Sequence, residues 1–213
     1  SRKNGAVSDA AHGLPAQPMP KIVDHQARRD AVADIAATHI ARHGLEAASI
    51  REIARAADCS TSIVSHYFRG KQDLLLSAYR LRMEETVAEV ERAAQAGGAL
   101  VDCIGAILPL DEQRADRWRI WLAFWGRATG DDAFLTEQKQ RSREAVDLFH
   151  RALLQTGTME DGEKARLVAQ ALLSNVAGIA TQAVFDPEGW PPARQIEILR
   201  LVASSLIPEG SAT

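Results

Sequence analysis

The stretch "CSTSIVSHYFRGK", residues 59–71, places small hydroxyl side chains, an imidazole, a phenol and two cations within one short run. The run is too short and too polar to form a core helix. It also holds no pair of side chains that works as nucleophile and base. Ser60 is of the residue type that caps helix starts, so a short helix is expected over 61–68. The exposed polar groups of that helix then raise the question of which molecule they bind.

The segment just before this run predicts a second short helix. The sequence "SIRE" at 49–52 is a capping box, in which Ser49 caps the helix start and Glu52 reaches back to it. This helix is expected over 50–57, followed by a turn at 58–59. Two short helices joined by three or four residues form a helix-turn-helix, which places its second helix in the major groove of DNA.

The second helix of this unit is expected to have one buried face and one exposed face. Val64 and Phe68 are four residues apart, so both point to the core. At about 100° per residue, Ser62, Ile63 and His66 lie roughly on the opposite side. The exposed face therefore carries the polar groups, together with one outward aliphatic side chain.

The exposed side chains fit DNA. Hydroxyl groups in the first turn exchange hydrogen bonds with base edges, and Ile63 suits a thymine methyl group. Tyr67 and Lys71 are placed to hold phosphates, together with the backbone N–H groups that begin the next helix. Two alternatives stay open, namely Tyr67 as a packing residue and His66 as an ordinary surface histidine. The residues predicted to contact DNA are Ser49, Thr61, Ser62, Ile63, Ser65, His66, Tyr67 and Lys71.

Charge is unevenly distributed along the 213 residues, which carry a formal net charge of −3. Residues 1–71 contain 10 Lys and Arg against 7 Asp and Glu, whereas residues 72–213 contain 15 against 21. A basic head on an acidic body suits a protein that presents one end to a polyanion. The two cysteines, Cys59 and Cys103, fit no metal or redox spacing, and the first 20 residues lack the apolar segment of a signal peptide. A reduced, cytoplasmic location without membrane contact is expected.

The remainder of the chain has helical periodicity and no alternating pattern of strands. The expected fold is all-α with about nine helices. We expect a flexible N-terminal extension over 1–20, a DNA-binding domain over 21–71 and a larger helical domain for ligand binding and dimerisation over 72–213. The further helices are expected over about 24–43, 72–95, 99–108, 114–129, 132–155, 163–185 and 192–206.

One helix of the larger domain is rich in aromatic residues. Trp118, Trp121 and Trp125 lie at positions i, i+3 and i+7 and share one face, with Phe124 to the side. These four residues are predicted to line a site for an apolar or cationic small molecule, since aromatic rings attract cations. The alternative is core packing, which a stripe at helical spacing usually indicates. The two interpretations are compatible where a cavity lies inside the core.

The segment "STSIVSHYFRGK" at 60–71 resembles the DNA-binding head of the TetR family of bacterial regulators. It is especially similar to the choline-responsive repressors of betaine synthesis. The resemblance includes "MPK" at 19–21, "RR" at 28–29 and "WLAFWGRA" at 121–128, and it extends to about residue 154. Ser65 stands where such proteins usually have a tyrosine.

The resemblance implies a homodimeric repressor that leaves a pseudo-palindromic operator when a small molecule binds. It also implies that the last two long helices pair with those of a second subunit. The small residues Ala177, Gly178 and Thr181 are expected at that interface. The segment "VAGIATQAVF" at 176–185 replaces a tryptophan-containing motif of the choline-responsive group.

Sequence motifs of enzymes are not found in the chain. No catalytic residues, metal ligands or cofactors are predicted, because the phosphate-binding, zinc-binding and nucleophile motifs are missing. Two other classes of protein stay open. One is a DNA-binding regulator without a small-molecule ligand, and the other is a small all-α enzyme or carrier whose head is only a packing module.

Overall fold

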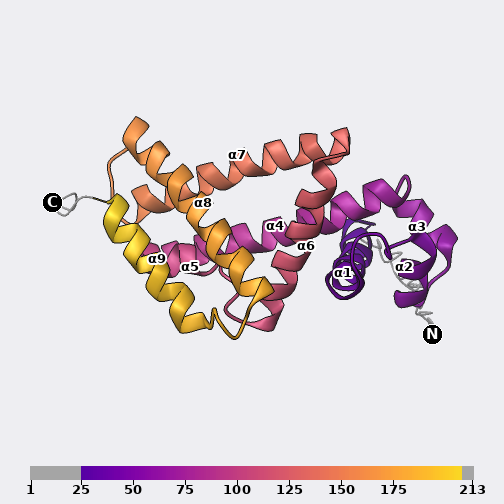
Figure 1. The fold of residues 1–213 in the computed structure, drawn as a ribbon. Coiled ribbons are helices and arrows are strands. Elements are labelled where there is room, and N and C mark those ends of the chain that lie inside the picture. Colours follow the sequence, from indigo (N-terminus) through magenta and orange to yellow (C-terminus); the bar gives the residue numbers. More distant parts are fainter. Residues whose placement is uncertain (1–24, 208–213) are drawn as a thin grey trace, which may run out of the picture.

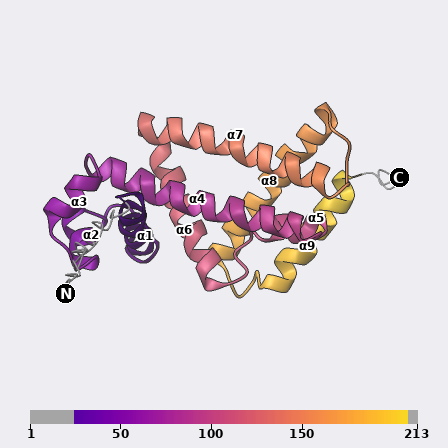
Figure 2. The ribbon, with the colours of Figure 1, turned by 180° about the vertical axis from the view of Figure 1, so that it is seen from behind.

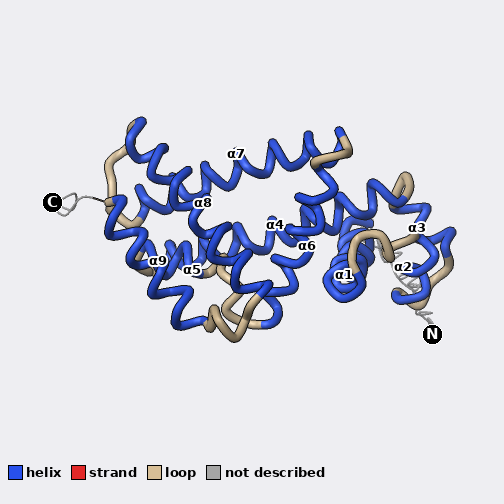
Figure 3. The backbone as a smooth tube through the Cα atoms, viewed as in Figure 1, coloured by secondary structure: helices blue, strands red, loops and turns tan. Residues whose placement is uncertain are grey.

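The computed structural model describes residues 25–207, and within them it contains nine helices and no strand (Figures 1 and 3). The all-α prediction is thereby confirmed. The predicted extension over 1–20 and the segment at 19–21 lie outside the described residues. The helices are α1 (His25–His43), α2 (Ile50–Ala56), α3 (Thr61–Tyr67), α4 (Lys71–Gln95), α5 (Leu100–Gly105), α6 (Glu112–Ala128), α7 (Asp132–Gln155), α8 (Glu163–Phe185) and α9 (Pro192–Leu206).

Local capping signals explain several helix boundaries. Gly44, with φ of +81°, follows the last residue of α1, as expected for a left-handed stop position. Asp111 caps α6 by accepting a hydrogen bond from the Arg114 N–H at 2.8 Å. The helix expected over 99–108 is shorter than predicted, because α5 ends at Gly105. Tighter turns follow it up to Pro109, since a residue that precedes proline avoids helical geometry.

The capping box at the start of α2 is only half formed. Ser49 Oγ accepts from the Glu52 N–H at 3.2 Å, which confirms the cap. The prediction that Glu52 reaches back to Ser49 is wrong, because its carboxylate binds Arg55 instead. The Ser49 N–H donates to the Ala47 carbonyl at 3.1 Å and needs no second partner. The cap therefore depends on the serine alone.

The helices form a small head, made of α1 to α3, and a larger body (Figures 1 and 2). Helix α4 begins in the head and runs on through the body, as the view from behind shows. Helix α1 packs against both α4 and α6. The junction between head and body is therefore built from three helices, and α4 connects the two parts directly.

Helices α8 and α9 pack against each other, and α8 also packs on α7. Val168, Leu172 and Val176 form part of the buried face of α8. Among the described helices, α8 alone is long and apolar enough to cross a membrane, a test that core helices also pass. Both helices also carry exposed apolar side chains: Phe185 of α8 is 73% exposed and Leu201 of α9 is 69% exposed. These side chains are largely uncovered by the residues that the structure describes.

Candidate DNA-binding interface and effector cavity

Helix α3 presents the two faces that the sequence predicts. Val64 and Phe68, which lies at the end of the helix, are buried in the head. The first-turn residues are exposed, and Ile63 exposes 45% of its surface. The exposed residues predicted to read DNA are Thr61, Ser62, Ile63, Ser65 and His66. The structure thus brings all five to one accessible helix, and their contacts with DNA stay a prediction.

Ser60 acts as the N-cap of α3, as expected. Its hydroxyl accepts from the Ile63 N–H at 3.4 Å and lies 2.7 Å from the Ser62 hydroxyl. The turn between α2 and α3 spans four residues and includes Asp58 with φ of +48°. The short turn fixes the first turn of α3 at the surface, where Ser62 is held by its neighbour.

An aromatic cluster lies at the end of α3. The rings of His66 and Tyr67 are 5.2 Å apart, and His25 of α1 lies 5.7 Å and 5.9 Å from them. Tyr67 is half-buried, so part of its side chain packs in the head and part is exposed to solvent. His25 was not predicted from the sequence, because nothing local connects it to a residue 41 positions later.

Lys71, predicted to hold a phosphate, has a partner inside the protein. Its Nζ donates to the Glu46 carbonyl at 3.2 Å and lies 4.0 Å from the Glu46 carboxylate. Arg127 of α6 contacts the same carboxylate at 3.4 Å. Both cations are partly exposed, so a phosphate can compete with Glu46 for Lys71. Glu46 thus connects the loop before α2 with the body.

Arg29 of α1 organises the head, a role that the sequence reasoning missed. Its guanidinium donates to the Tyr67 carbonyl at 2.8 Å and to Asp73 at 2.9 Å, and it lies over the Phe68 ring. Partial burial alone would raise the pKa of the Asp73 carboxyl, but the Arg69 N–H and the Arg29 guanidinium outweigh it and hold that pKa below its usual value. The only signal in the sequence is the pair of arginines at 28–29.

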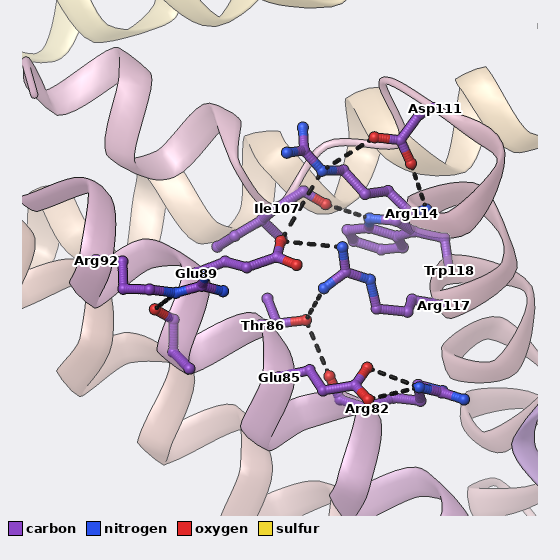
Figure 4. A network of polar contacts seen from close by, with 11 residues as sticks. Arg82, Glu85, Thr86, Glu89, Arg92, Ile107, Asp111, Arg114, Arg117 and Trp118 are labelled. Carbon is purple, nitrogen blue, oxygen red and sulfur yellow. Dashed lines mark hydrogen bonds and ion pairs between the residues drawn. The ribbon is translucent and has the colours of Figure 1, made fainter. Parts of the chain in front are cut away.

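The body contains a cavity of about 670 Å³, called here the tryptophan cavity, bounded mainly by α4, α6, α7 and α8. Trp118, Trp121 and Trp125 all belong to its wall, as predicted from their spacing. The Trp118 N–H donates to the Ile107 carbonyl at 2.7 Å (Figure 4). This size is typical of small-molecule sites in proteins. The tryptophan stripe is therefore both core and cavity wall.

Phe124 does not reach the tryptophan cavity, which differs from the expectation that it lines the ligand site. Its ring stacks on Tyr79 at 4.6 Å with an angle of 13° between the planes. Tyr79, on α4, stands in the cavity wall and donates its hydroxyl hydrogen to Gln138 Oε1. Burial raises the pKa of the Tyr79 phenol to about 12. The rotation between Trp121 and Phe124 along α6 explains why the phenylalanine backs a wall residue instead.

Acidic side chains outnumber basic ones in the wall of the tryptophan cavity. Three of the acidic residues are paired: Glu144 with Arg141, Glu91 with Arg151, and Asp147 with Arg166 outside the wall. The acidic wall residues are Glu84, Glu91, Glu144 and Asp147, and the basic ones are Arg141 and Arg151. This balance favours a cationic or neutral ligand over an anion.

A buried polar network lies directly behind the wall (Figure 4). Arg117 of α6 is buried, and it donates to Glu89 at 3.0 Å and to the Thr86 hydroxyl at 3.3 Å. Thr86 lines the cavity and donates to the Arg82 carbonyl at 2.9 Å. Arg82 in turn binds Asp34 of α1. The network therefore connects the cavity wall to the first helix of the head.

The residues predicted at a subunit interface lie along α8. Gly178 is exposed, whereas Ala177 and Thr181 are half-buried. Ala177 also belongs to the cavity wall, and the Thr181 hydroxyl donates to the Ala177 carbonyl at 2.7 Å.

Across residues 25–207, no group of three or more His, Cys, Asp or Glu side chains is arranged to hold a metal ion. Both cysteines are free.

The fold and its helix-turn-helix head define a DNA-binding transcriptional regulator. Comparisons with known proteins identify the family of this regulator. Residues 33–78 match the bacterial regulatory proteins of the tetR family, and residues 96–208 match the C-terminal domain of BetI-type transcriptional repressors. The chain belongs to the TetR family, with a BetI-type C-terminal domain. The expectation that the resemblance ends near residue 154 is wrong, because the match continues through α8 and α9.

Individual relatives agree with this assignment. The transcriptional regulator BetI of Vibrio atlanticus is 31% identical over 80% of this chain and 87% of its own length. BetI of one Escherichia coli strain is 32% identical over 68% and 79% of the two chains. These relatives are transcriptional regulators and not enzymes.

Solved structures share the fold. A transcriptional regulator from Rhodococcus sp. Rha1 has a TM-score of 0.72 with 24% identity, covering 84% of this chain and 95% of that one. A regulator from Saccharomonospora viridis in complex with choline has a TM-score of 0.65 with 22% identity, covering 86% and 100%.

Proposed function

We propose that this regulator is a homodimeric repressor, which binds a pseudo-palindromic operator and is released by a small molecule in the tryptophan cavity. In this proposal residues 21–71 form the DNA-binding domain, and residues 72–213 bind the effector and the second subunit. The cytoplasm is the proposed location. The observation that carries the proposal is the course of α4, which starts beside α3 with Lys71 and then supplies Tyr79 and Thr86 to the cavity wall.

The effector and the operator are coupled through this shared helix. A ligand that moves the cavity side of α4 changes the position of the head, because α1 packs on α4 and α6. Coupling between two sites is reciprocal, so an effector that weakens DNA binding is itself bound more weakly by the DNA complex. The polar network from Thr86 through Arg82 to Asp34 offers a second connection between the same two parts.

The class of effector follows from the wall. Three indole rings and an excess of carboxylates favour a compact apolar or cationic molecule, since aromatic faces attract cations. The choline bound by the Saccharomonospora viridis regulator supports testing choline first. The outward apolar side chains of α8 and α9 support a dimer, because a large exposed apolar surface usually marks an interface.

Operator binding is the test of the proposal. Fluorescence anisotropy measures the affinity of the purified protein for labelled DNA that flanks its own gene, with a scrambled duplex as control. We expect tight binding to the specific duplex, and release when choline is titrated in. Equal, weak binding to both duplexes would favour an enzyme or carrier. Specific binding without any response to small molecules would favour a regulator that has no ligand.

A further inference from the structure

One carboxylate lies between two cations at the junction of head and body. Glu46 belongs to the loop between α1 and α2. Its carboxylate lies 4.0 Å from Lys71 Nζ and accepts a hydrogen bond from Arg127 at 3.4 Å. Lys71 begins α4, and Arg127 lies in the last turn of α6. The Glu46 carboxylate therefore joins a predicted phosphate-binding residue to the end of a helix of the body.

These side chains border one recess of about 280 Å³. Its charged residues are Glu46, Lys71, Arg127 and Asp131. Arg127 is also held by the body, because it lies 3.2 Å from Asp131 and 5.8 Å from the centroid of the Phe134 ring. Arg127 is thus fixed to α6 and α7, whereas Glu46 is carried by a loop of the head.

The contacts of Lys71 are weak enough to be exchanged. The Glu46 side chain is 81% exposed and that of Lys71 is 42% exposed. An ion pair between such exposed groups changes an equilibrium by about fivefold at most. A DNA phosphate is a strong competitor, because its neutralisation also releases condensed counterions. Lys71 therefore has two alternative anionic partners, Glu46 and a phosphate.

We propose that the Glu46 carboxylate competes with a DNA phosphate for Lys71, and that Arg127 sets the outcome. An arginine beside Glu46 neutralises the carboxylate and lowers its hold on Lys71, which favours the phosphate. When Arg127 moves away, the carboxylate binds Lys71 more strongly and the phosphate contact weakens. Glu46 is therefore a positioning residue, which acts on DNA through Lys71.

Arg127 connects this competition to the tryptophan cavity. It follows Trp125 by two residues in α6, the helix that supplies all three tryptophans of the wall. A ligand that displaces the end of α6 also displaces Arg127 from Glu46, and this loss weakens operator binding. The inference rests on the proposed function, since it needs a phosphate contact of Lys71, and it adds a route that starts from α6.

The variant Glu46→Gln tests the competition without any small molecule. It removes the charge and keeps the Glu46 carbonyl, which also accepts from Lys71. Fluorescence anisotropy of the full-length protein measures affinity for operator and scrambled duplexes over a range of salt concentrations. Both affinities should rise by about two- to fivefold, and the slope of log affinity against log salt should become steeper. In a Lys71→Ala background the same substitution should have almost no effect.

The variant Asp58→Asn is the matched control for charge. Asp58 is exposed in the turn between α2 and α3, and asparagine tolerates its left-handed backbone. This variant changes the net charge of the head by the same amount as Glu46→Gln. Any rise in affinity that it causes should be the same with Lys71 present or replaced by alanine.

A double-mutant cycle tests the role of Arg127. Arg127→Gln should lower operator affinity by about two- to fivefold when Glu46 is present, and should change it little in the Glu46→Gln background. The lost cation alone would lower affinity equally in both backgrounds. Equal effects would therefore overturn the role of Arg127.

The remaining outcomes separate this inference from the proposed function. A rise in Glu46→Gln that persists in Lys71→Ala, as for Asp58→Asn, would overturn the competition and leave the repressor standing. Unchanged affinity and salt slope in Lys71→Ala would also overturn it, because Lys71 would then stay with Glu46 in the DNA complex. Equal, weak binding of both duplexes by the wild type would instead overturn the proposed function.

Discussion

The Arg29 guanidinium lies over the ring of Phe68, 4.7 Å from its centroid, and joins three helices of the DNA-binding end. Besides this contact, it donates to the Tyr67 carbonyl at the end of α3 and to Asp73 in the first turn of α4. One side chain of α1 thus contacts both the end of α3 and the beginning of α4. The geometry of α3 therefore depends on Arg29, although Arg29 belongs to α1 and is not one of the exposed polar residues of α3.

Replacing Arg29 with Met should destabilise the head by about 2 kcal/mol, since hydrogen bonds from a partly buried charged group are lost. Urea unfolding measures the free energy of unfolding, and amide exchange in α3 should become faster. Operator affinity should fall as well. Arg28→Met is the matched control, because Arg28 is exposed and its loss removes the same charge. Equal effects of both variants would mean that only charge matters here.

The exposed face of α3 should control sequence discrimination. Ser62→Ala and His66→Ala should each reduce the preference for operator over random DNA by about 1–3 kcal/mol, if each loses a good base contact. Anisotropy against the two duplexes measures this preference. Ser65→Ala, on the same helix, shows whether a third exposed hydroxyl contributes. An equal loss on both duplexes for Ser62→Ala and His66→Ala would contradict the assignment of this face.

Phosphate contacts should behave differently from base contacts. Lys71→Ala and Tyr67→Phe should weaken binding to all sequences, and Lys71→Ala should also reduce the slope of log affinity against log salt by about one. The structure adds a condition, because Lys71 must exchange the Glu46 carbonyl for a phosphate. An unchanged salt slope in Lys71→Ala would show that Lys71 stays with Glu46 in the DNA complex.

Local signals in the sequence account for the parts that were predicted well. Ser49, Ser60 and Gly44 act within a few residues of their own positions, so the helix boundaries around them followed from capping rules. The spacing of Val64 and Phe68 gave the buried face of α3, and the spacing of the tryptophans gave one wall of the cavity.

The contacts that the sequence did not predict depend on packing between residues far apart in the chain. Arg29 finds partners 38 and 44 positions later, and no periodicity connects them. Phe124 stacks on Tyr79, which belongs to another helix, so its absence from the cavity wall depended on how α4 and α6 pack. Which indole N–H finds an acceptor depends on the Ile107 carbonyl, a backbone group outside the stripe itself.

Tyr79 should titrate far above an ordinary tyrosine. Burial raises the pKa of its phenol to about 12, whereas an unfolded tyrosine ionises near 10. The phenol therefore stays protonated to a higher pH in the folded state than in the unfolded state. As a result, the free energy of unfolding should fall as the pH rises from about 10 to about 12. This one residue then contributes up to about 3 kcal/mol, because its pKa is about 12 in the folded state and near 10 in the unfolded state.

Absorbance near 295 nm measures this titration directly. The chain has two tyrosines, so Tyr67→Phe leaves Tyr79 as the single phenol. In this variant the folded protein should titrate near 12 and the protein in urea near 10. A folded-state titration near 10 would show that Tyr79 is accessible to water, and that the cavity wall is more open than the structure indicates.

The substitution Gly178→Leu tests the proposed dimer and should disturb the packing inside one subunit only slightly. A Cβ atom at this position would meet nothing within 4 Å, so Gly178→Leu should not strain the monomer. Its helix propensity should even improve, by up to about 1 kcal/mol. At an interface, however, two added leucines would overpack the contact and cost about 1–3 kcal/mol, because symmetry places the change in both subunits.

Light scattering should show more monomer for Gly178→Leu, and operator affinity should fall although the head is unchanged. A single head contacts DNA mainly through phosphates, so the preference for the operator should weaken most. Gly126→Leu on α6 is the matched control, because a Cβ atom there also meets nothing within 4 Å and the residue is also exposed. A fully dimeric Gly178→Leu with normal operator affinity would place the interface elsewhere on α8 and α9, around Phe185 and Leu201.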